Sequence, residues 1–135
     1  MSAPPPEGGA ACVLDASALL AYLQTEPGHE AVEEVLDIAL ISSVNWSEVV
    51  QKALSRGVDV TGLRADMAAL GVTVVPFDAD DAEAAAGLWP ETVSLGLSLG
   101  DRACLGLGMR RQAPVYTADR LWSRAALPVT VRAIR

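Results

Sequence analysis

Four acidic residues stand at the ends of predicted elements, where several carboxylates could act on one ligand. Asp15 ends a short apolar run, and Asp119 follows a strand-like segment. Glu48 and Asp101 are each predicted to lie in the first turn of a helix. Carboxylate oxygens are ligands for hard cations such as Mg²⁺, which Mn²⁺ could replace. A cation held in this way polarises a phosphodiester and lowers the pKa of a bound water, so the residue types predict metal-assisted hydrolysis.

Each of these acids also has a purely structural interpretation. The pairs Asn45–Glu48 and Ser98–Asp101 have the spacing of a capping box, and the other two acids could cap the helices that follow them. Taken one at a time, each acid is better explained as a cap. Caps need no common location, whereas a cation needs several carboxylates at one point. Convergence of the four acids therefore favours a metal site, because a bound cation relieves their mutual repulsion.

Strand-like and helix-like segments alternate along the chain. The strand-like segments are residues 11–14, 40–44, 72–75, 114–117 and 129–131. The helix-like segments are residues 17–23, 29–40, 45–54, 60–70, 78–88, 99–111 and 120–125. This alternation predicts an α/β fold with three layers, α/β/α, around a mostly parallel central sheet. Ligands of such sheets bind at the carboxyl ends of the strands, where the four acids are expected.

Length and composition predict a single domain preceded by a tail. The 135 residues are 51% hydrophobic and carry a net charge of −7, which excludes disorder for most of the chain. Residues 1–11 are rich in Pro and Gly and lack a basic region, so we expect a disordered tail rather than a secretory signal. No apolar run is long enough to cross a membrane. Cys12 and Cys104 lack metal or redox spacing, which is typical of buried thiols in the cytoplasm.

The charge is distributed unevenly. Residues 1–100 hold 15 acids and 3 bases, whereas residues 101–135 hold 2 acids and 7 bases. The acidic majority argues against general nucleic-acid binding. The basic C-terminal segment could still form one local anion-binding face, or it could be an ordinary solvated surface.

Four segments together resemble a known family. Residues 13–20 (VLDASALL), 43–49 (SVNWSEV), 99–103 (LGDRA) and 115–119 (VYTAD) resemble, in order and spacing, the PIN-domain nucleases. Within these they are similar to the VapC-type toxins of bacterial toxin–antitoxin modules. The likeness runs from Cys12 to the C-terminus, so the expected PIN domain is residues 12–135.

The resemblance implies a Mg²⁺-dependent endoribonuclease that uses metal-activated water and leaves 5′-phosphate and 3′-hydroxyl ends, with tRNA, rRNA and mRNA open as substrates. The implied metal-binding and catalytic acids are Asp15, Glu48, Asp101 and Asp119. Ser17 and Thr117 match the hydroxyl positions beside the first and last acids. We expect substrate phosphates to be held by basic residues near these acids, namely Arg102, Arg110, Arg111 and Arg120.

The resemblance also implies two protein partners, a small cognate antitoxin and a second copy of the chain. The apolar stripes of residues 17–23 and 29–40, with Trp46 and Trp89, could form such interfaces, although most of these side chains are better explained as core. We expect an extended antitoxin segment beside the acids, with an Arg that competes with Mg²⁺.

Two other classes of protein with acids at strand ends need residues that this chain lacks. A receiver domain needs a lysine after its last strand, and residues 129–135 contain none. A haloacid-dehalogenase-type phosphatase needs an Asp where this chain has Ser17. A catalytically weak PIN-fold binding module, and a PIN nuclease of RNA processing without an antitoxin, stay open as alternatives.

Overall fold

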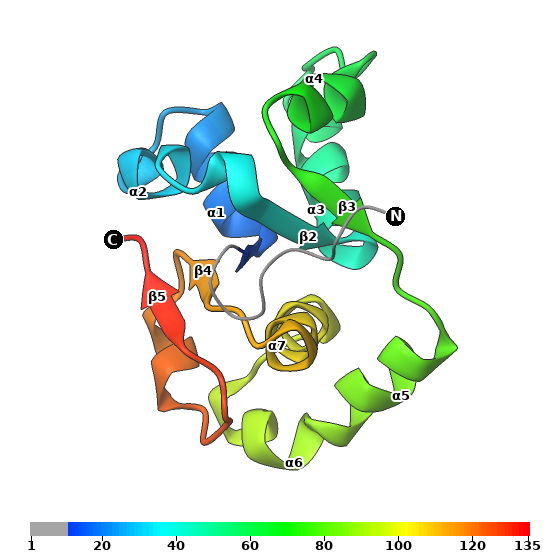
Figure 1. The fold of residues 1–135 in the computed structure, drawn as a ribbon, viewed down its shortest axis with the longest axis vertical. Coiled ribbons are helices and arrows are strands. Elements are labelled where there is room, and N and C mark those ends of the chain that lie inside the picture. Colours follow the sequence, from blue (N-terminus) through cyan, green and yellow to red (C-terminus); the bar gives the residue numbers. More distant parts are fainter. Residues whose placement is uncertain (1–10) are drawn as a thin grey trace, which may run out of the picture.

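The structure of the protein is a computed structural model that describes residues 11–135. Within this part of the chain, helices cover both faces of one five-stranded parallel sheet (Figure 1). The predicted three-layer α/β/α architecture is confirmed. Apart from Ala11, the tail predicted for residues 1–11 lies outside the described residues. No helix in the described part is long and apolar enough to span a membrane.

The sheet has strand order β3-β2-β1-β4-β5, and every neighbouring pair is parallel. The strands are β1 (Cys12–Leu14), β2 (Ala39–Ser42), β3 (Thr73–Val75), β4 (Val115–Thr117) and β5 (Val131–Ala133). The chain builds outward from β1 to β3 and then returns to add β4 and β5 on the other side of β1. The strand order therefore reverses between β1 and β4, and such a switch point is where ligands bind in open α/β sheets.

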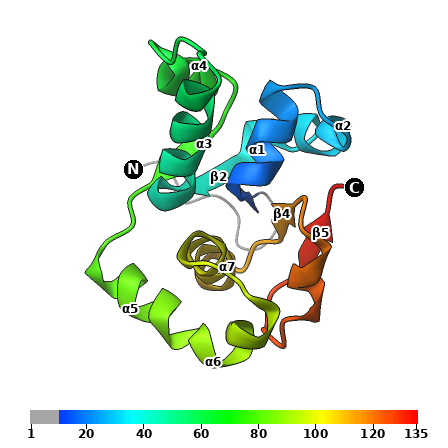
Figure 2. The ribbon, with the colours of Figure 1, turned by 180° about the vertical axis from the view of Figure 1, so that it is seen from behind.

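Helices connect the strands and surround the sheet (Figures 1 and 2). The α-helices are α1 (Ala16–Leu23), α2 (His29–Glu33), α3 (Ser43–Ser55), α4 (Leu63–Ala69), α5 (Ala79–Gly87), α6 (Trp89–Thr92) and α7 (Leu99–Arg111). The 3₁₀-helices are η1 (Leu36–Ile38), η2 (Val93–Leu95) and η3 (Arg120–Arg124). The bounds of α7 agree with the prediction. Gly71 follows α4 with φ of 106°, in the left-handed conformation that suits a glycine after a helix.

The predicted helix over residues 29–40 was wrong in its second half. Helix α2 ends at Glu33, η1 follows, and residues from Ala39 onward form β2. The apolar spacing of Val32, Leu36 and Ala39 fits one helix, yet the three buried residues belong to three elements, α2, η1 and β2. Pairing of Ala39 with Cys12 in the sheet overrides the helical pattern.

The start of α3 also differs from the prediction. The helix begins at Ser43 because the Ser42 hydroxyl caps it, accepting a hydrogen bond from Val44 N at 3.2 Å. Glu48 is therefore not in the first turn, and Asn45 is not the cap residue, so the Asn45–Glu48 capping box was wrong. The last strand is likewise displaced, from residues 129–131 to β5.

The short helical segments depart from the prediction in two further places. Residues 120–125 were predicted as a short helix and form η3, a 3₁₀-helix. Trp89-Pro90 was expected to end the helical region, but α6 begins there. A proline in the first turn of a helix is tolerated because its missing N–H would have no partner.

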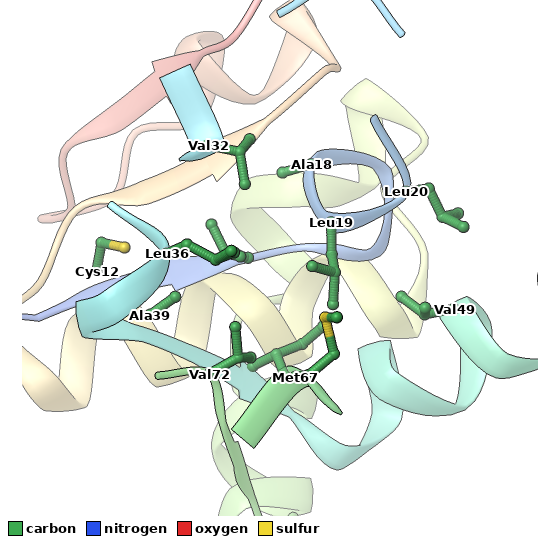
Figure 3. Packing of buried hydrophobic residues seen from close by; sticks show 12 residues of the cluster. Cys12, Ala18, Leu19, Leu20, Val32, Leu36, Ala39, Val49, Met67 and Val72 are labelled. Carbon is green, nitrogen blue, oxygen red and sulfur yellow. The ribbon is translucent and has the colours of Figure 1, made fainter. Parts of the chain in front are cut away.

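The core lies on both sides of the sheet. On one side, buried residues of α1, α2, η1, α3 and α4 pack against residues of β1 and β2 (Figure 3). On the other side, Val13, Leu105, Val115 and Trp122 pack together under α7. Both cysteines are buried and free, as predicted.

Most of the apolar stripe that could have formed an interface belongs to this core. Leu19, Leu20, Val32 and Leu36 are buried, which confirms the core interpretation for them. Trp46 is partly buried against the same cluster. Several large apolar side chains stay exposed on other elements, among them Trp89, Val93, Leu99 and Leu121.

Candidate active site

Asp15 lies at the switch point, directly after β1 and at the N-cap of α1. Its Oδ1 accepts hydrogen bonds from Ala18 N at 2.8 Å and from the Ser17 hydroxyl at 2.7 Å. Its Oδ2 accepts from the Thr117 hydroxyl at 2.7 Å. Burial raises the pKa of Asp15 to about 6; the hydrogen bonds oppose this shift, and the nearby charge of Asp101 adds to it.

Ser17 and Thr117 join the two sides of the switch point. The Ser17 hydroxyl also accepts a hydrogen bond from Ala118 N at 2.9 Å. The Thr117 hydroxyl accepts one from Asp119 N at 3.0 Å. The end of β4 is therefore held to the Asp15 carboxylate by two hydroxyl groups, and Asp119 is placed just beyond them.

Glu48 is held against the N-terminus of α7. Asn45 Nδ2 donates to Glu48 Oε1 at 3.0 Å and to the Gly100 carbonyl at 2.9 Å. A Cβ atom on Gly100 would lie 2.6 Å from Glu48 Oε1, so a side chain at this position would displace the carboxylate. The sequence interpretation missed the roles of Asn45 and Gly100, because it assigned Asn45 to a cap.

Asp101 and Asp119 are both helix caps. Asp101 and Ser98 form the predicted capping box, in which Asp101 Oδ2 accepts from Ser98 N at 2.8 Å. Asp119 Oδ1 accepts from Leu121 N at 2.9 Å at the start of η3. The capping interpretation is thus confirmed for Asp15, Asp101 and Asp119. These capping roles are compatible with a shared site, because the fold brings all three acids to one edge of the sheet.

The four predicted acids line one open cavity of about 390 Å³. The same cavity is lined by Lys52 of α3, by Arg56 at the C-cap of that helix, and by Arg135. The sequence interpretation missed these cations, although Lys52 follows Glu48 by four residues and so shares its helix face. A larger hollow of about 550 Å³ at the opposite end of the sheet, against Cys12 and Arg132, holds none of the four acids.

The four arginines predicted to hold phosphates do not line this cavity. Arg102 Nη1 donates to the Leu97 carbonyl at 3.2 Å, and Arg120 Nε donates to the Arg135 carbonyl at 2.8 Å. Arg110 is about 13 Å along α7 from the acidic end of that helix and forms an ion pair with Asp81 of α5. No contact among the described residues tests their predicted role in substrate binding, and for Arg110 and Arg111 the position at the far end of α7 argues against that role.

Of the four, Arg102 and Arg120 remain the better candidates for phosphate contacts. Arg102 lies next to Asp101, and Arg120 lies next to Asp119, whereas Arg110 and Arg111 end α7 far from the cavity.

The donor set suits a hard divalent cation. Within residues 11–135, no three Asp, Glu, His or Cys side chains already converge closely enough to hold a metal ion. Each carboxylate is instead engaged by local hydrogen bonds, but Glu48 Oε2, Asp101 Oδ1 and Asp119 Oδ2 accept none among the described residues. Asn45 Oδ1 is buried without a partner there. These oxygens are the ligand type that Mg²⁺ prefers.

Electrostatics support the proximity of the acids. Cys104 is fully buried in α7, and its thiol pKa lies well above the usual value. Burial is the main cause, followed by the negative charges of Asp15, Asp101 and Glu48. Three carboxylates from three elements thus act on one buried point, which a cation would neutralise.

The fold and site define an α/β protein with an acidic centre at the switch point of its sheet. The sequence model of the PIN domain matches residues 12–127. The chain therefore belongs to the PIN domain family. No curated protein matches the chain significantly.

Solved structures share this fold at low sequence identity. A toxin–antitoxin complex from Klebsiella pneumoniae is similar with a TM-score of 0.71 and 20% identity, over 93% of this chain and 98% of that one. A DNA-bound VapBC from Salmonella typhimurium has a TM-score of 0.68 and 16% identity over the same shares. VapBC-5 from Mycobacterium tuberculosis has a TM-score of 0.59 and 24% identity, over 93% of this chain and 98% of that one.

Proposed function

We propose that the protein is a Mg²⁺-dependent endoribonuclease and the toxin of a type II toxin–antitoxin system. The observation that carries the proposal is that Asp15, Glu48, Asp101 and Asp119 line one cavity at the switch point. Membership of the PIN family supports nuclease chemistry. The toxin–antitoxin complexes among the similar structures support the biological role.

In this proposal the chain positions the metal and the attacking water through its own side chains. Asp15 and Asp101 are the firmest ligands, because both lie where β1 and α7 meet the switch point. Glu48 completes the site or orients the water through its uncommitted Oε2. Asp119 acts directly, through a water, or through Thr117, which already binds its backbone N–H.

A divalent cation held by these oxygens supplies a polarised phosphodiester and a bound water of lowered pKa. Hydrolysis there would join the water oxygen to phosphorus as the bond from phosphorus to the 3′ oxygen breaks. The water would lose one proton and the leaving 3′ oxygen would gain one, so that protons balance. The products are a 5′-phosphate and a 3′-hydroxyl.

The cations on the cavity rim suit a polyanionic strand. Lys52 is exposed on α3 and Arg56 is exposed at the C-cap of that helix, about one and two turns beyond Glu48. Arg135 donates to the Pro27 carbonyl at 3.0 Å and lies 3.7 Å from Glu26. These groups give the acidic cavity a basic side, where we place the phosphates that flank the cut.

An active ribonuclease needs a restraint, which we assign to a small cognate antitoxin in the cytoplasm. An antitoxin Arg inserted among the acids would displace Mg²⁺, because both compete for the same carboxylates. We also propose a homodimer. Exposed apolar residues on α6, η2 and η3 (Trp89, Val93 and Leu121) offer a surface that a partner would cover.

The test is expression of the protein alone and with the neighbouring small open reading frame. Expression alone should arrest growth and cut cellular RNA, and co-expression should give a stable, inactive complex. Sequencing the cut transcripts after brief expression would identify the RNA class. A well-behaved monomer that binds no product of that reading frame would contradict the toxin–antitoxin assignment.

A catalytically weak binding module is the second candidate. The observation in its favour is that three of the four acids already cap helices and that no preformed metal cluster exists among residues 11–135. Such a module would bind the same partner yet leave RNA uncut in the presence of Mg²⁺. The same expression experiment separates the two candidates.

A further inference from the structure

We propose that Asn45 is a positioning residue of the acidic site, with two separate functions. Its amide nitrogen fixes the Glu48 carboxylate against α7, and its amide oxygen accepts a hydrogen bond from a water bound to the cation. This inference rests on the proposed metal-dependent function, and it adds a residue that is neither an acid nor a cap.

The orientation of the Asn45 amide follows from its partners. Asn45 is 1% exposed, and two atoms lie within hydrogen-bond distance of its Nδ2. These are Glu48 Oε1 at 3.0 Å and the Gly100 carbonyl at 2.9 Å, and both can only accept hydrogen bonds. The reversed amide would oppose oxygen to oxygen at both contacts. The nitrogen therefore faces Glu48 and α7.

The backbone of α7 completes the support for Glu48. Gly100 is buried, and a Cβ atom at residue 100 would lie only 2.6 Å from Glu48 Oε1. Gly100 directly precedes Asp101. Asn45 thus joins α3 to the N-terminus of α7 and fixes the distance between the two acids that these helices carry.

The amide oxygen has no partner among the described residues. Asn45 Oδ1 is buried and accepts no hydrogen bond, although an unsatisfied buried acceptor is costly. Asn45 also lines the cavity that contains the four acids. A donor is needed there, and the carboxylates cannot supply one while ionised. A cation-bound water supplies it, because the cation strengthens the water as a donor.

The first test measures metal binding without RNA. Purified full-length wild type and Asn45→Ala would be titrated with Mn²⁺ by calorimetry, and the free energy of unfolding would be measured in EDTA. We expect the Kd for Mn²⁺ to rise about tenfold in Asn45→Ala, as for other residues that orient metal ligands. The cleavage rate should then need correspondingly more Mg²⁺ to saturate.

Thr92→Val is the matched control. Thr92 is fully buried, and its hydroxyl donates to the Leu88 carbonyl at 2.8 Å, in a helix that contributes nothing to the acidic cavity. This variant should lose stability and keep the wild-type Kd for Mn²⁺. If Asn45→Ala loses stability in the same way and also keeps the wild-type Kd, Asn45 is only structural and the proposal is overturned.

A second pair of variants keeps the proposal testable if Asn45→Ala does not fold. Gly100→Ala displaces the Glu48 carboxylate and leaves Asn45 in place. Gly106→Ala adds the same methyl group to the same helix, where its nearest neighbour would be Leu88 at 3.9 Å. We expect weakened Mn²⁺ binding for Gly100→Ala alone. Equal Kd values for these two variants would overturn the proposal.

Failure of this inference differs from failure of the proposed function. If wild type binds no Mn²⁺, both the proposed metal-dependent function and the inference about Asn45 are wrong. If wild type binds Mn²⁺ and Glu48→Gln weakens binding, but Asn45→Ala and Gly100→Ala do not, only the role of Asn45 is wrong.

Discussion

At the scale of single residues, the buried Asp15 carboxyl group is the acid of the site whose ionisation costs folding free energy. The fold buries this group at the switch point and raises its pKa to about 6, despite hydrogen bonds from Ser17, Thr117 and Ala18. Burial thus disfavours the ionised form of this carboxyl group, and in the proposed function a bound cation would offset that cost. The residue lies between β1 and α1, where it caps α1 and is the proposed metal ligand.

The first prediction is that Asp15 makes stability depend on pH in the metal-free protein. Its pKa is about 6 in the folded state against 3.8 in the unfolded state, so folding favours the protonated form. Its contribution to stability is full below pH 3.8, declines as pH rises, and is lost above about pH 6. The loss is about 3 kcal/mol at pH 8.

Urea unfolding in EDTA at several pH values measures this effect. Asp15→Asn should be more stable than wild type at pH 8, with the difference vanishing near pH 4, and Mg²⁺ should stabilise wild type but not Asp15→Asn. Asp80→Asn changes an exposed acid of α5 and serves as the control. Parallel pH profiles for wild type and Asp15→Asn would contradict the prediction.

A second prediction concerns the cations of the cavity rim. Replacing Lys52 and Arg56 by Ala should weaken RNA binding for all sequences alike, because phosphate contacts carry no sequence information. The slope of log affinity against log salt should fall by about one to two units. Binding by a catalytically inactive Glu48→Gln background, measured from 50 to 200 mM salt, tests this.

Arg110→Ala combined with Arg111→Ala is the matched pair for that experiment, since both residues lie at the far end of α7. Neither residue lines the cavity, so the slope of log affinity against log salt for this double variant should equal that of the background protein. A reduced slope for this pair, with none for Lys52 and Arg56, would show that the strand follows α7 instead.

The residues that carry the site were predictable to different degrees. The four acids were identified from residue type and from the ends of predicted elements, and the structure does bring them to one cavity. Lys52 was overlooked because it had no role as a ligand, although its spacing from Glu48 was readable. The position of Arg135 depends on the contact of the chain end with Pro27, in the loop before α2, and no local sequence pattern encodes this contact.

At the scale of elements, α7 is the frame that supports the site. Its first turn carries Gly100 and Asp101 against α3, its middle is buried against β1 and β4, and its last turn carries Arg110. Arg110 pairs with Asp81, which in turn belongs to the capping box of α5. The far end of α7 is therefore fixed to α5 rather than to a ligand.

The third prediction is that Arg110→Ala lowers the free energy of unfolding without changing metal binding. The side chain of Asp81 is 10% exposed and that of Arg110 47%, so the pair lies between a surface and a buried ion pair. We expect a loss of about 1 to 2 kcal/mol in the free energy of unfolding. Calorimetric Mn²⁺ binding should stay at the wild-type value; a weakened Kd would mean that α5 helps to position the site.

Element boundaries were predictable where local chemistry is strong. The capping box of Ser98 and Asp101 set the start of α7 correctly. Residues 29–40 and the start of α3 were misjudged, because helix and strand share apolar spacings over such short segments. Sheet pairing of Ala39 and the cap at Ser42 decided the outcome there.

At the scale of the whole molecule, the strand order brings helix-capping acids from separate parts of the chain together in one site. Asp15 follows the central strand, and the return of the chain to β4 places Thr117 and Asp119 beside it. The alternation of elements predicted a parallel sheet, but not the order β3-β2-β1-β4-β5, which depends on long-range packing. Convergence of the acids is thus a property of the fold, which the sequence anticipated from the carboxyl ends of the predicted strands and from the family resemblance.

The fourth prediction concerns the whole complex. If an antitoxin Arg occupies the acids, rising Mg²⁺ concentration should weaken inhibition, because cation and guanidinium compete for the same carboxylates. Cleavage of a labelled RNA by the purified complex at increasing Mg²⁺ would measure this. Inhibition that is independent of Mg²⁺ would place the antitoxin away from the acids.

The most direct measurement of the central claim is RNA cleavage by purified protein with mapped product ends. Wild type should cut RNA in Mg²⁺, stop in EDTA, and leave 5′-phosphate and 3′-hydroxyl ends. Asp15→Asn and Asp101→Asn should reduce cleavage to background, while Asp80→Asn should cut at the wild-type rate. Wild-type cleavage by Asp15→Asn with unchanged Mg²⁺ dependence would contradict the account.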